Sequence, residues 1–134
     1  MRNISAALTT AQMRARTKTV TRRMGWQYLI DAVAKAQAQG LPLPRLQVCE
    51  KCMGLRKGQL MVKICVIEVI SATLEPLHML LDHPDYGKNE CIKEGFPDWK
   101  PQKFVDFFCS THKEPDGKPC TPESTVTRIE FRYV

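Results

Sequence analysis

The residues best suited to chemistry form one short run, Lys18-Thr19-Val20-Thr21-Arg22-Arg23. Lysine and arginine neutralise phosphates, and threonine hydroxyls donate to phosphate oxygens or attack an electrophile. Residues 1–26 hold six Lys or Arg and no Asp or Glu, and the rest of the chain is charge-balanced, so the net charge of +6 lies in this part. The run predicts a face for an anionic partner. The alternative is a solvated edge strand protected by its cations.

Two single residues further along the chain add to this set. Glu94 lies in the stretch Cys-Ile-Lys-Glu-Gly-Phe-Pro. A carboxylate beside such a turn can act as a general acid or base, and a surface carboxylate at a helix end is the alternative. Trp99 lies in a turn rich in Pro and Asp. It is a candidate for stacking on a base, and partial burial in the core is the alternative.

Some of the cysteines have the spacing of metal ligands. Cys49 and Cys52 form a Cys-x-x-Cys pair, and Cys109 with His112 places a thiol and an imidazole on one helical face. Together they would give a tetrahedral set for zinc. The alternative is a reduced core thiol at Cys109, which follows two phenylalanines. We expect no cofactor, and a zinc ion bound by these four residues is the alternative.

Composition excludes several classes of protein. The chain has 134 residues, 43% of them hydrophobic and 25% charged, as expected for one globular domain. No apolar run is long enough to span a membrane, and cations at Arg14, Arg16 and Lys18 interrupt any secretion signal. Neither phosphate-binding glycine motif, GxxxxGK[ST] or GxGxxG, is present. We expect a monomeric cytoplasmic protein with no membrane partner and reduced cysteines.

Hydrophobic periodicity predicts the elements that position these residues. Apolar residues at three- and four-residue steps indicate helices over 11–16, 24–39 and 101–111, and Pro101 suits the first helical position. Alternation indicates strands over 4–8, 59–72 and 125–134, with a change of phase near Ile67. The other expected segments are a connector over 41–53, a helical turn over 75–81, loops over 83–87 and 114–123, and a short helix over 89–94. This mixture predicts an α+β fold with a small twisted sheet or barrel.

These residues resemble the ASCH domain, a relative of the PUA fold. The resemblance rests on the Lys18–Arg23 run, on the turn Gly54-Leu55-Arg56-Lys57-Gly58-Gln59 and on the ending Arg128-Ile129-Glu130-Phe131. The chain is also similar to small ASCH-like proteins of bacteriophages and prophages. They share its Thr-Val-Thr-Arg-Arg-x-Gly-Trp opening, its Glu-Gly-Phe-Pro stretch, its Phe-Val-x-x-Phe-Cys helix and its Val-Thr-Arg-Ile-Glu-Phe ending.

The resemblance implies a single ASCH/PUA-like domain over residues 1–134, with a helical insert at about 24–53. The fold would be a small mixed β-barrel with flanking helices, and the basic run would line a cleft that the insert could cover. ASCH proteins are associated with RNA, so the implied partner is RNA or a modified nucleotide in a bacterial host cell. The implied binding residues are Arg16, Lys18, Thr19, Arg22, Arg23 and Trp99.

The resemblance also implies two alternatives to pure binding. Some bacterial ASCH proteins hydrolyse the acetyl amide of acetylated cytidine, and others are reported as ribonucleases. Carried over, Lys18 would take the proton of Thr21, Thr21 would attack the amide carbonyl, and Glu94 would protonate the leaving amine or orient water. The second alternative is a zinc-stabilised phage protein whose basic face docks on a host protein. Binding is the leading expectation.

Overall fold

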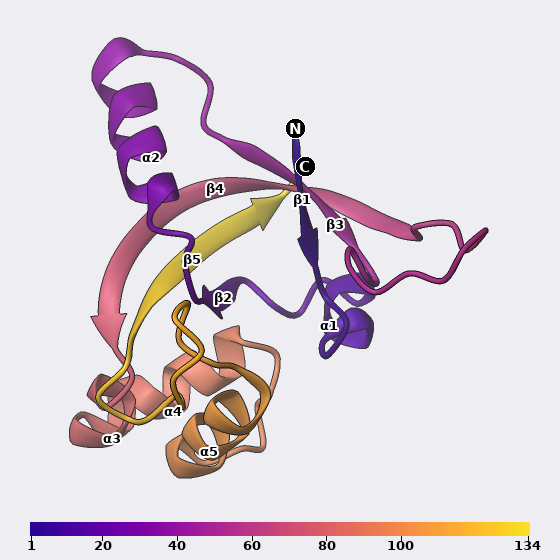
Figure 1. Cartoon of the computed structure of the whole chain (residues 1–134). Helices are drawn as coiled ribbons and strands as arrows, with labels where there is room; N and C mark the ends of the chain where they lie inside the picture. Colours follow the sequence, from indigo (N-terminus) through magenta and orange to yellow (C-terminus); the bar gives the residue numbers. More distant parts are fainter.

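The computed structural model describes residues 1–134, which form five strands and five helices (Figure 1). No helix combines the length and the apolar character needed to cross a membrane. In chain order the elements are β1 (Arg2–Ser5), α1 (Thr10–Arg14), β2 (Val20–Arg23), α2 (Tyr28–Gln39), β3 (Arg45–Cys49), β4 (Lys63–Pro76), α3 (Met79–Asp82), α4 (Pro84–Lys93), α5 (Pro101–Thr111) and β5 (Thr125–Tyr133).

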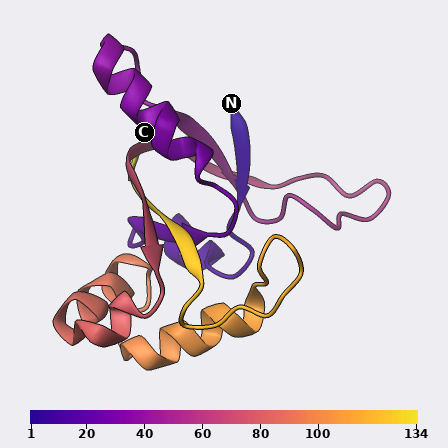
Figure 2. The same cartoon turned by 60° about the vertical axis from the view of Figure 1, so that its left-hand side comes forward.

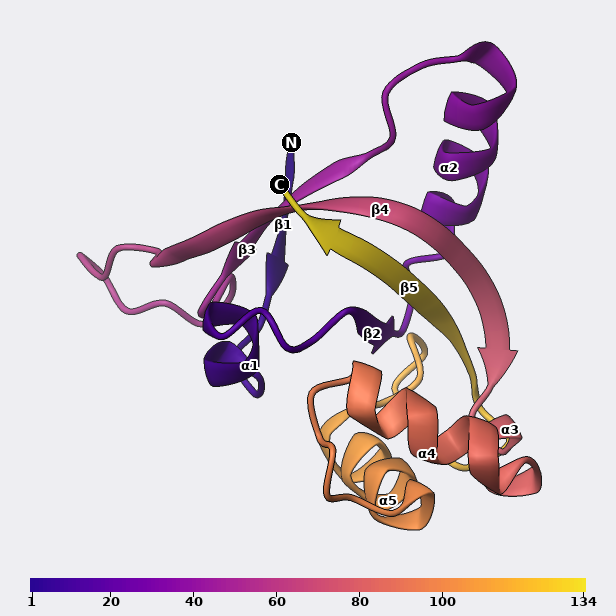
Figure 3. The same ribbon diagram turned by 180° about the vertical axis from the view of Figure 1, so that it is seen from behind.

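The five strands form one curved sheet in the order β1-β3-β4-β5-β2. The pair β1–β3 is parallel, and the other three pairs are antiparallel. The long strand β4 bends along its length, and its register with β5 shifts between Val69 and Ser71. A bulge of this kind increases local twist, and the sheet curls into a half-barrel with β1 and β2 as its two edges (Figure 3).

Two hydrophobic clusters fill the molecule. The first lies inside the curved sheet and includes Leu29 and Val33 of α2, which packs against β4. The second holds α3, α4 and α5 together at the other end of the sheet, as Figure 2 shows. Its largest members are Leu77, Leu80, Phe104 and Phe108. Fully burying each such side chain stabilises the fold by about 1.5–3 kcal/mol.

The long elements agree with the sequence in type, but β4 begins and ends four residues later than predicted, and α2 begins at Tyr28 rather than at residue 24. The α+β prediction is confirmed, α5 begins at Pro101, and β5 runs over nearly the expected range. Two short elements were missed. The connector predicted over 41–53 contains β3, whose Leu46 and Val48 alternate into the first cluster. The loop predicted over 83–87 is the first part of α4, because Pro84 occupies a first-turn position that proline tolerates.

Candidate ligand pocket and its charge network

The basic run forms an edge strand, but its charges are not exposed. Strand β2 pairs with β5 alone, with Thr21 opposite Ile129 and Arg22 opposite Arg128. Lys18, Thr21 and Arg22 nevertheless keep only 4%, 4% and 2% of their surface exposed. The solvated-edge alternative is therefore wrong for these three residues. Because neighbouring residues on a strand face opposite sides, Thr21 and Arg23 share one face and Arg22 lies on the other.

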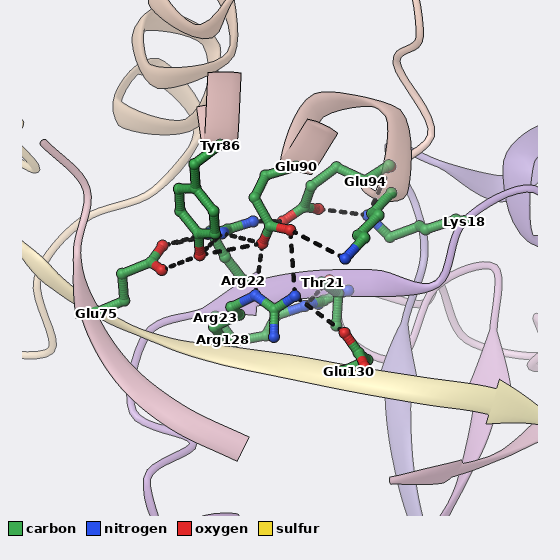
Figure 4. Close-up of polar contacts among 11 residues, drawn as sticks. Lys18, Thr21, Arg22, Arg23, Glu75, Tyr86, Glu90, Glu94, Arg128 and Glu130 are labelled. Atoms are coloured by element: carbon green, nitrogen blue, oxygen red, sulfur yellow. Dashed lines mark hydrogen bonds and ion pairs between the residues drawn. The ribbon is translucent and has the colours of Figure 1, made fainter. Parts of the chain in front are cut away.

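Arg22 is held by three carboxylates (Figure 4). Its Nε and Nη2 donate to Glu75 Oε1 at 3.0 and 2.9 Å. Its Nη2 also donates to Glu90 Oε1 at 2.6 Å, and its Nη1 to Glu94 Oε2 at 2.9 Å. Burial opposes the charge of Arg22, but the carboxylates of Glu94, Glu75 and Glu90 outweigh burial and raise its pKa. This guanidinium has little capacity left for a ligand.

Lys18 and Glu94 form a second buried ion pair. Lys18 Nζ donates to Glu94 Oε1 at 2.7 Å and to the Glu94 carbonyl oxygen at 3.0 Å. Burial lowers the pKa of Lys18, and the neighbouring Glu94 carboxylate offsets only part of that effect. An amine in this setting loses its proton more easily than a surface lysine.

Arg128 extends the network along β5. Its guanidinium donates to both oxygens of Glu90 and, at 3.0 Å, to Glu130 Oε2. Burial alone would raise the pKa of Glu90, but Arg128 and Arg22 lower it to about 2. Tyr86 donates to Glu75 Oε2. No buried polar side-chain atom lacks a partner, so the network is fully satisfied.

Arg23 differs from Arg22 because no carboxylate pairs with it. Its Nε donates to Thr21 Oγ1 at 3.1 Å, and its Nη2 donates to the Ser5 carbonyl oxygen at 2.7 Å. The bond to Ser5 links β2 to the end of β1. These are the two edge strands of the sheet, and no backbone hydrogen bonds pair them with each other. Burial lowers the pKa of Arg23, with partial opposition from Glu94 and Cys52. Its Nη1 group has no hydrogen-bond acceptor in the protein.

A pocket of about 150 Å³ lies where Arg23 spans this gap. Its polar part is formed by Lys18, Thr21, Arg22, Arg23 and Glu94. The loop from Ser5 to Thr9 forms another side. Its remaining wall is aromatic and comes from Phe96, Phe104, Phe107, Phe108 and His112. No residue of 24–53 lines the pocket, so the segment that contains α2 does not cover it.

The predicted site residues fall into two groups. The pocket brings together Lys18, Thr21, Arg22, Arg23 and Glu94, although no hydrogen bond joins Lys18 Nζ to Thr21 Oγ1. Outside it lie Arg16, over the ring of Tyr133, and Thr19, whose backbone bonds to Lys93 and Phe131. Trp99 also lies outside, with its ring stacked on Phe96 at 4.0 Å.

The zinc set is not assembled. No group of three or more His, Cys, Asp or Glu side chains could hold a metal ion, so Cys49, Cys52, Cys109 and His112 do not converge. Cys109 Sγ lies 3.0 Å from Cys120 Sγ, and burial together with Cys120 raises the pKa of Cys109 to about 12. The His112 ring stacks on Phe108 at 3.9 Å. His112 therefore forms part of the aromatic wall.

Sequence reasoning named Glu94 but missed the other residues of the charge network, which are Glu75, Tyr86, Glu90 and Arg128. Glu75 and Arg128 lie far from the basic run in the chain, and no spacing connects them. Tyr86, Glu90 and Glu94 recur at four-residue steps, which places them on one face of a helix. That signal was present in the sequence, but the predicted loop over 83–87 concealed it.

The comparisons with known proteins support the fold. No family model and no curated protein matches the chain. A solved protein from Enterococcus faecalis V583, of family DUF984, superposes with a TM-score of 0.52 at 13% identity. An ASCH domain from Lactobacillus crispatus JV V101 superposes with a TM-score of 0.51 at 14% identity. The two matches cover 93% and 94% of this chain, and 66% and 70% of those chains.

The half-barrel sheet with its flanking helices is an ASCH/PUA-like α+β fold, as the resemblance implied. This chain spans about two thirds of the length of the E. faecalis protein. At such low identity the likeness defines the fold, and the function must be argued from the pocket itself. The similarity to phage and prophage proteins stays a prediction.

Proposed function

We propose that this protein binds a nucleoside unit, free or within RNA, by taking its base into the pocket between β2 and α5. The observation that carries the proposal is the size and lining of the pocket. A cavity of about 150 Å³ accommodates one benzene-sized ring. Its aromatic wall suits the faces of a planar ring, and its charged end suits the polar edge of a base.

The polar groups match the two kinds of atom on a base edge. Lys18 Nζ and Arg23 Nη1 have donors left over for a ring carbonyl oxygen. Glu94 is a carboxylate that can accept from an amino group. Cytosine carries both kinds of atom, so a cytidine derivative fits this arrangement. We take the functional unit to be a monomer.

Titration calorimetry with cytidine, acetylated cytidine, uridine and inorganic phosphate tests the proposal. We expect saturable binding of a nucleoside, weakened at least about 10-fold in Arg23→Gln, because a hydrogen bond to a charged donor contributes about 1.5–3 kcal/mol. The matched control is Arg2→Gln. Arg2 also lacks a carboxylate partner but lies over Trp26, away from the pocket. Absence of nucleoside binding, or equal losses in both variants, would contradict the proposal.

Hydrolysis of an acetylated base is a second candidate, and the setting of Lys18 favours it. This buried amine has a lowered pKa and shares the pocket with Thr21 and Glu94. Lys18 would have to turn from Glu94 toward Thr21 Oγ1 to take its proton. Thr21 would then attack the amide carbonyl, the protonated amine would leave, and water would release acetate from the acyl-threonine.

Chromatographic detection of cytidine and acetate released from acetylated cytidine tests this candidate. Thr21→Val should abolish turnover while keeping the size and shape of the side chain. Thr19→Val is the matched control, because Thr19 lies two residues away and outside the pocket. Equal turnover by both variants would exclude Thr21 as the nucleophile, and no turnover by the unaltered protein would leave binding as the function.

A further inference from the structure

The buried cations Lys18 and Arg22 are paired with carboxylates, but cations without an ion-pair partner lie on the segment between β3 and β4. This segment, residues 50–62, is called the arm below. It contains the exposed cations Lys51, Arg56 and Lys57, and Lys63 follows at the start of β4. Its one carboxylate, Glu50, pairs with Arg14 at 2.6 Å. None of the three arm cations has an ion-pair partner, in contrast to Lys18 and Arg22.

The arm projects from the sheet past α1 (Figures 1 and 3). The Glu50 N–H donates to the Val62 carbonyl oxygen at 2.9 Å and closes its base. Asn3 Nδ2 of β1 also donates to Met61 Sδ at 3.7 Å, while Met53 and Leu60 are 84% and 85% exposed and Lys51, Arg56 and Lys57 are exposed as well. Its cations are therefore available to a partner in solution.

The base of the arm adjoins the pocket. Ser5 pairs with Cys49, the last residue before the arm, and the Ala6 N–H donates to the Cys49 carbonyl oxygen at 2.8 Å. Ser5 and Ala6 are also pocket residues. A chain leaving the pocket on this side would meet the arm directly.

We propose that the arm binds the phosphate backbone of a single RNA strand whose base occupies the pocket, with Lys51, Arg56 and Lys57 contacting phosphates. This inference rests on the proposed function and extends it from a nucleoside to a polynucleotide. Three unpaired cations without an unpaired carboxylate suit a linear polyanion. The base of the arm adjoins Ser5 and Ala6 of the base-sized pocket. This favours RNA over an anionic membrane, which would make no use of the pocket.

Fluorescence anisotropy with a short single-stranded RNA, measured over a range of salt concentrations, tests the arm. We expect the triple variant Lys51→Gln, Arg56→Gln, Lys57→Gln to reduce the slope of log K against log salt by about 2, since each phosphate contact contributes about 0.7 for single strands. Its affinity at low salt should fall at least 10-fold. The matched control is Lys35→Gln, Lys88→Gln, Lys100→Gln, which removes the same charge from α2, α4 and the residue before α5.

Cytidine binding by the same variants separates this inference from the proposed function. The arm variant should bind cytidine as the unaltered protein does. An unchanged salt slope with cytidine binding intact would overturn the arm alone. Absence of cytidine binding by the unaltered protein would overturn both. Equal slope losses in the two triple variants would show a general charge effect and overturn the arm. Vesicles of phosphatidylserine test the membrane alternative. If the protein binds them, if Met53→Ser and Leu60→Ser abolish that binding, and if the RNA salt slope does not depend on the arm cations, the arm proposal is overturned.

Discussion

Arg22 and Arg23 are neighbours on β2, yet the protein uses the two guanidiniums in opposite ways. Arg22 contacts Glu75, Glu90 and Glu94, and its side chain has no exposed surface. Arg23 has no carboxylate partner, donates to Thr21 and to a backbone carbonyl, and lines the pocket. The first arginine joins β2 to α4, while the second keeps donors for a ligand.

The difference follows from strand geometry and from what each face meets. Alternation directs the two side chains to opposite sides of β2. One side faces Glu90 of α4 and Glu94, the residue that follows this helix, and the other faces the gap between β1 and β2. A localised positive charge in a sequence therefore does not show where positive charge is available to a ligand. The buried carboxylates decide that.

Replacing each arginine by methionine should separate the two roles most strongly. Arg22→Met leaves three carboxylates around an uncharged side chain, so we expect it to lower the free energy of unfolding by about 3–5 kcal/mol. Arg23→Met removes two hydrogen bonds but exposes no buried charge, and we expect a loss of about 1–2 kcal/mol. Urea denaturation of both variants measures the difference. Equal losses would show that the carboxylate cluster does not depend on Arg22.

Acid should weaken the charge network around Arg22, because it protonates the Glu90 carboxylate. The ordinary pKa of a glutamate, 4.5, falls to about 2 for Glu90 in the folded protein. Between these values the unfolded chain binds a proton that the folded chain does not. The stabilisation is therefore complete above pH 4.5 and is lost as the pH falls toward 2. Its size is about 3 kcal/mol.

Urea denaturation between pH 6 and pH 2 measures this loss, with Glu90→Gln as the comparison. The variant should be less stable at pH 6 and should lose less stability on acidification, because residue 90 no longer takes up a proton. The same pH dependence in both proteins would show that other carboxylates account for the acid sensitivity.

Sequence reasoning predicted the long elements, and three of the candidate residues that it named lie together in the structure. The helix after Pro101 and the final strand carry strong periodic patterns, and the structure contains both. Lys18, Thr21 and Glu94, singled out by a motif and a resemblance, line one pocket. The helix and the strand were predictable because their patterns depend on residues that are close together in the chain. The functional roles of Lys18, Thr21 and Glu94 stay a prediction.

The rest depends on contacts between distant residues. Glu75 meets Arg22 across 53 positions, and Arg128 meets Glu90 across 38. Three of the aromatic residues in the pocket wall, Phe104, Phe107 and Phe108, come from α5 and looked like ordinary core residues. Strand β3 has only five residues and follows two prolines, so its pattern is too short to distinguish from a connector. Tertiary pairing with β1 and β4 makes it a strand.

Lys18 combines features of the two arginines. Like Arg22 it is paired with a buried carboxylate, Glu94, and like Arg23 it lines the pocket. Burial lowers its pKa below 10.5, and Glu94 opposes that effect. We expect Glu94→Gln to lower the pKa of Lys18 further, since it removes an opposite charge within hydrogen-bond distance. Nitrogen-detected NMR titration of the lysine side chains measures the midpoint. A higher midpoint in the variant would contradict the assigned balance between burial and charge.

Breaking the exposed ion pair between Arg14 and Glu50 should change the free energy of unfolding least. This pair is therefore the reference for the buried ion pairs. Its N–O distance of 2.6 Å equals that between Arg22 and Glu90, but its side chains are 51% and 40% exposed. Water screens such a pair, so Arg14→Gln should lower the free energy of unfolding by no more than about 1 kcal/mol. Added salt should reduce that difference further. A loss as large as that of Arg22→Met would mean that distance, rather than burial, sets the strength of these contacts.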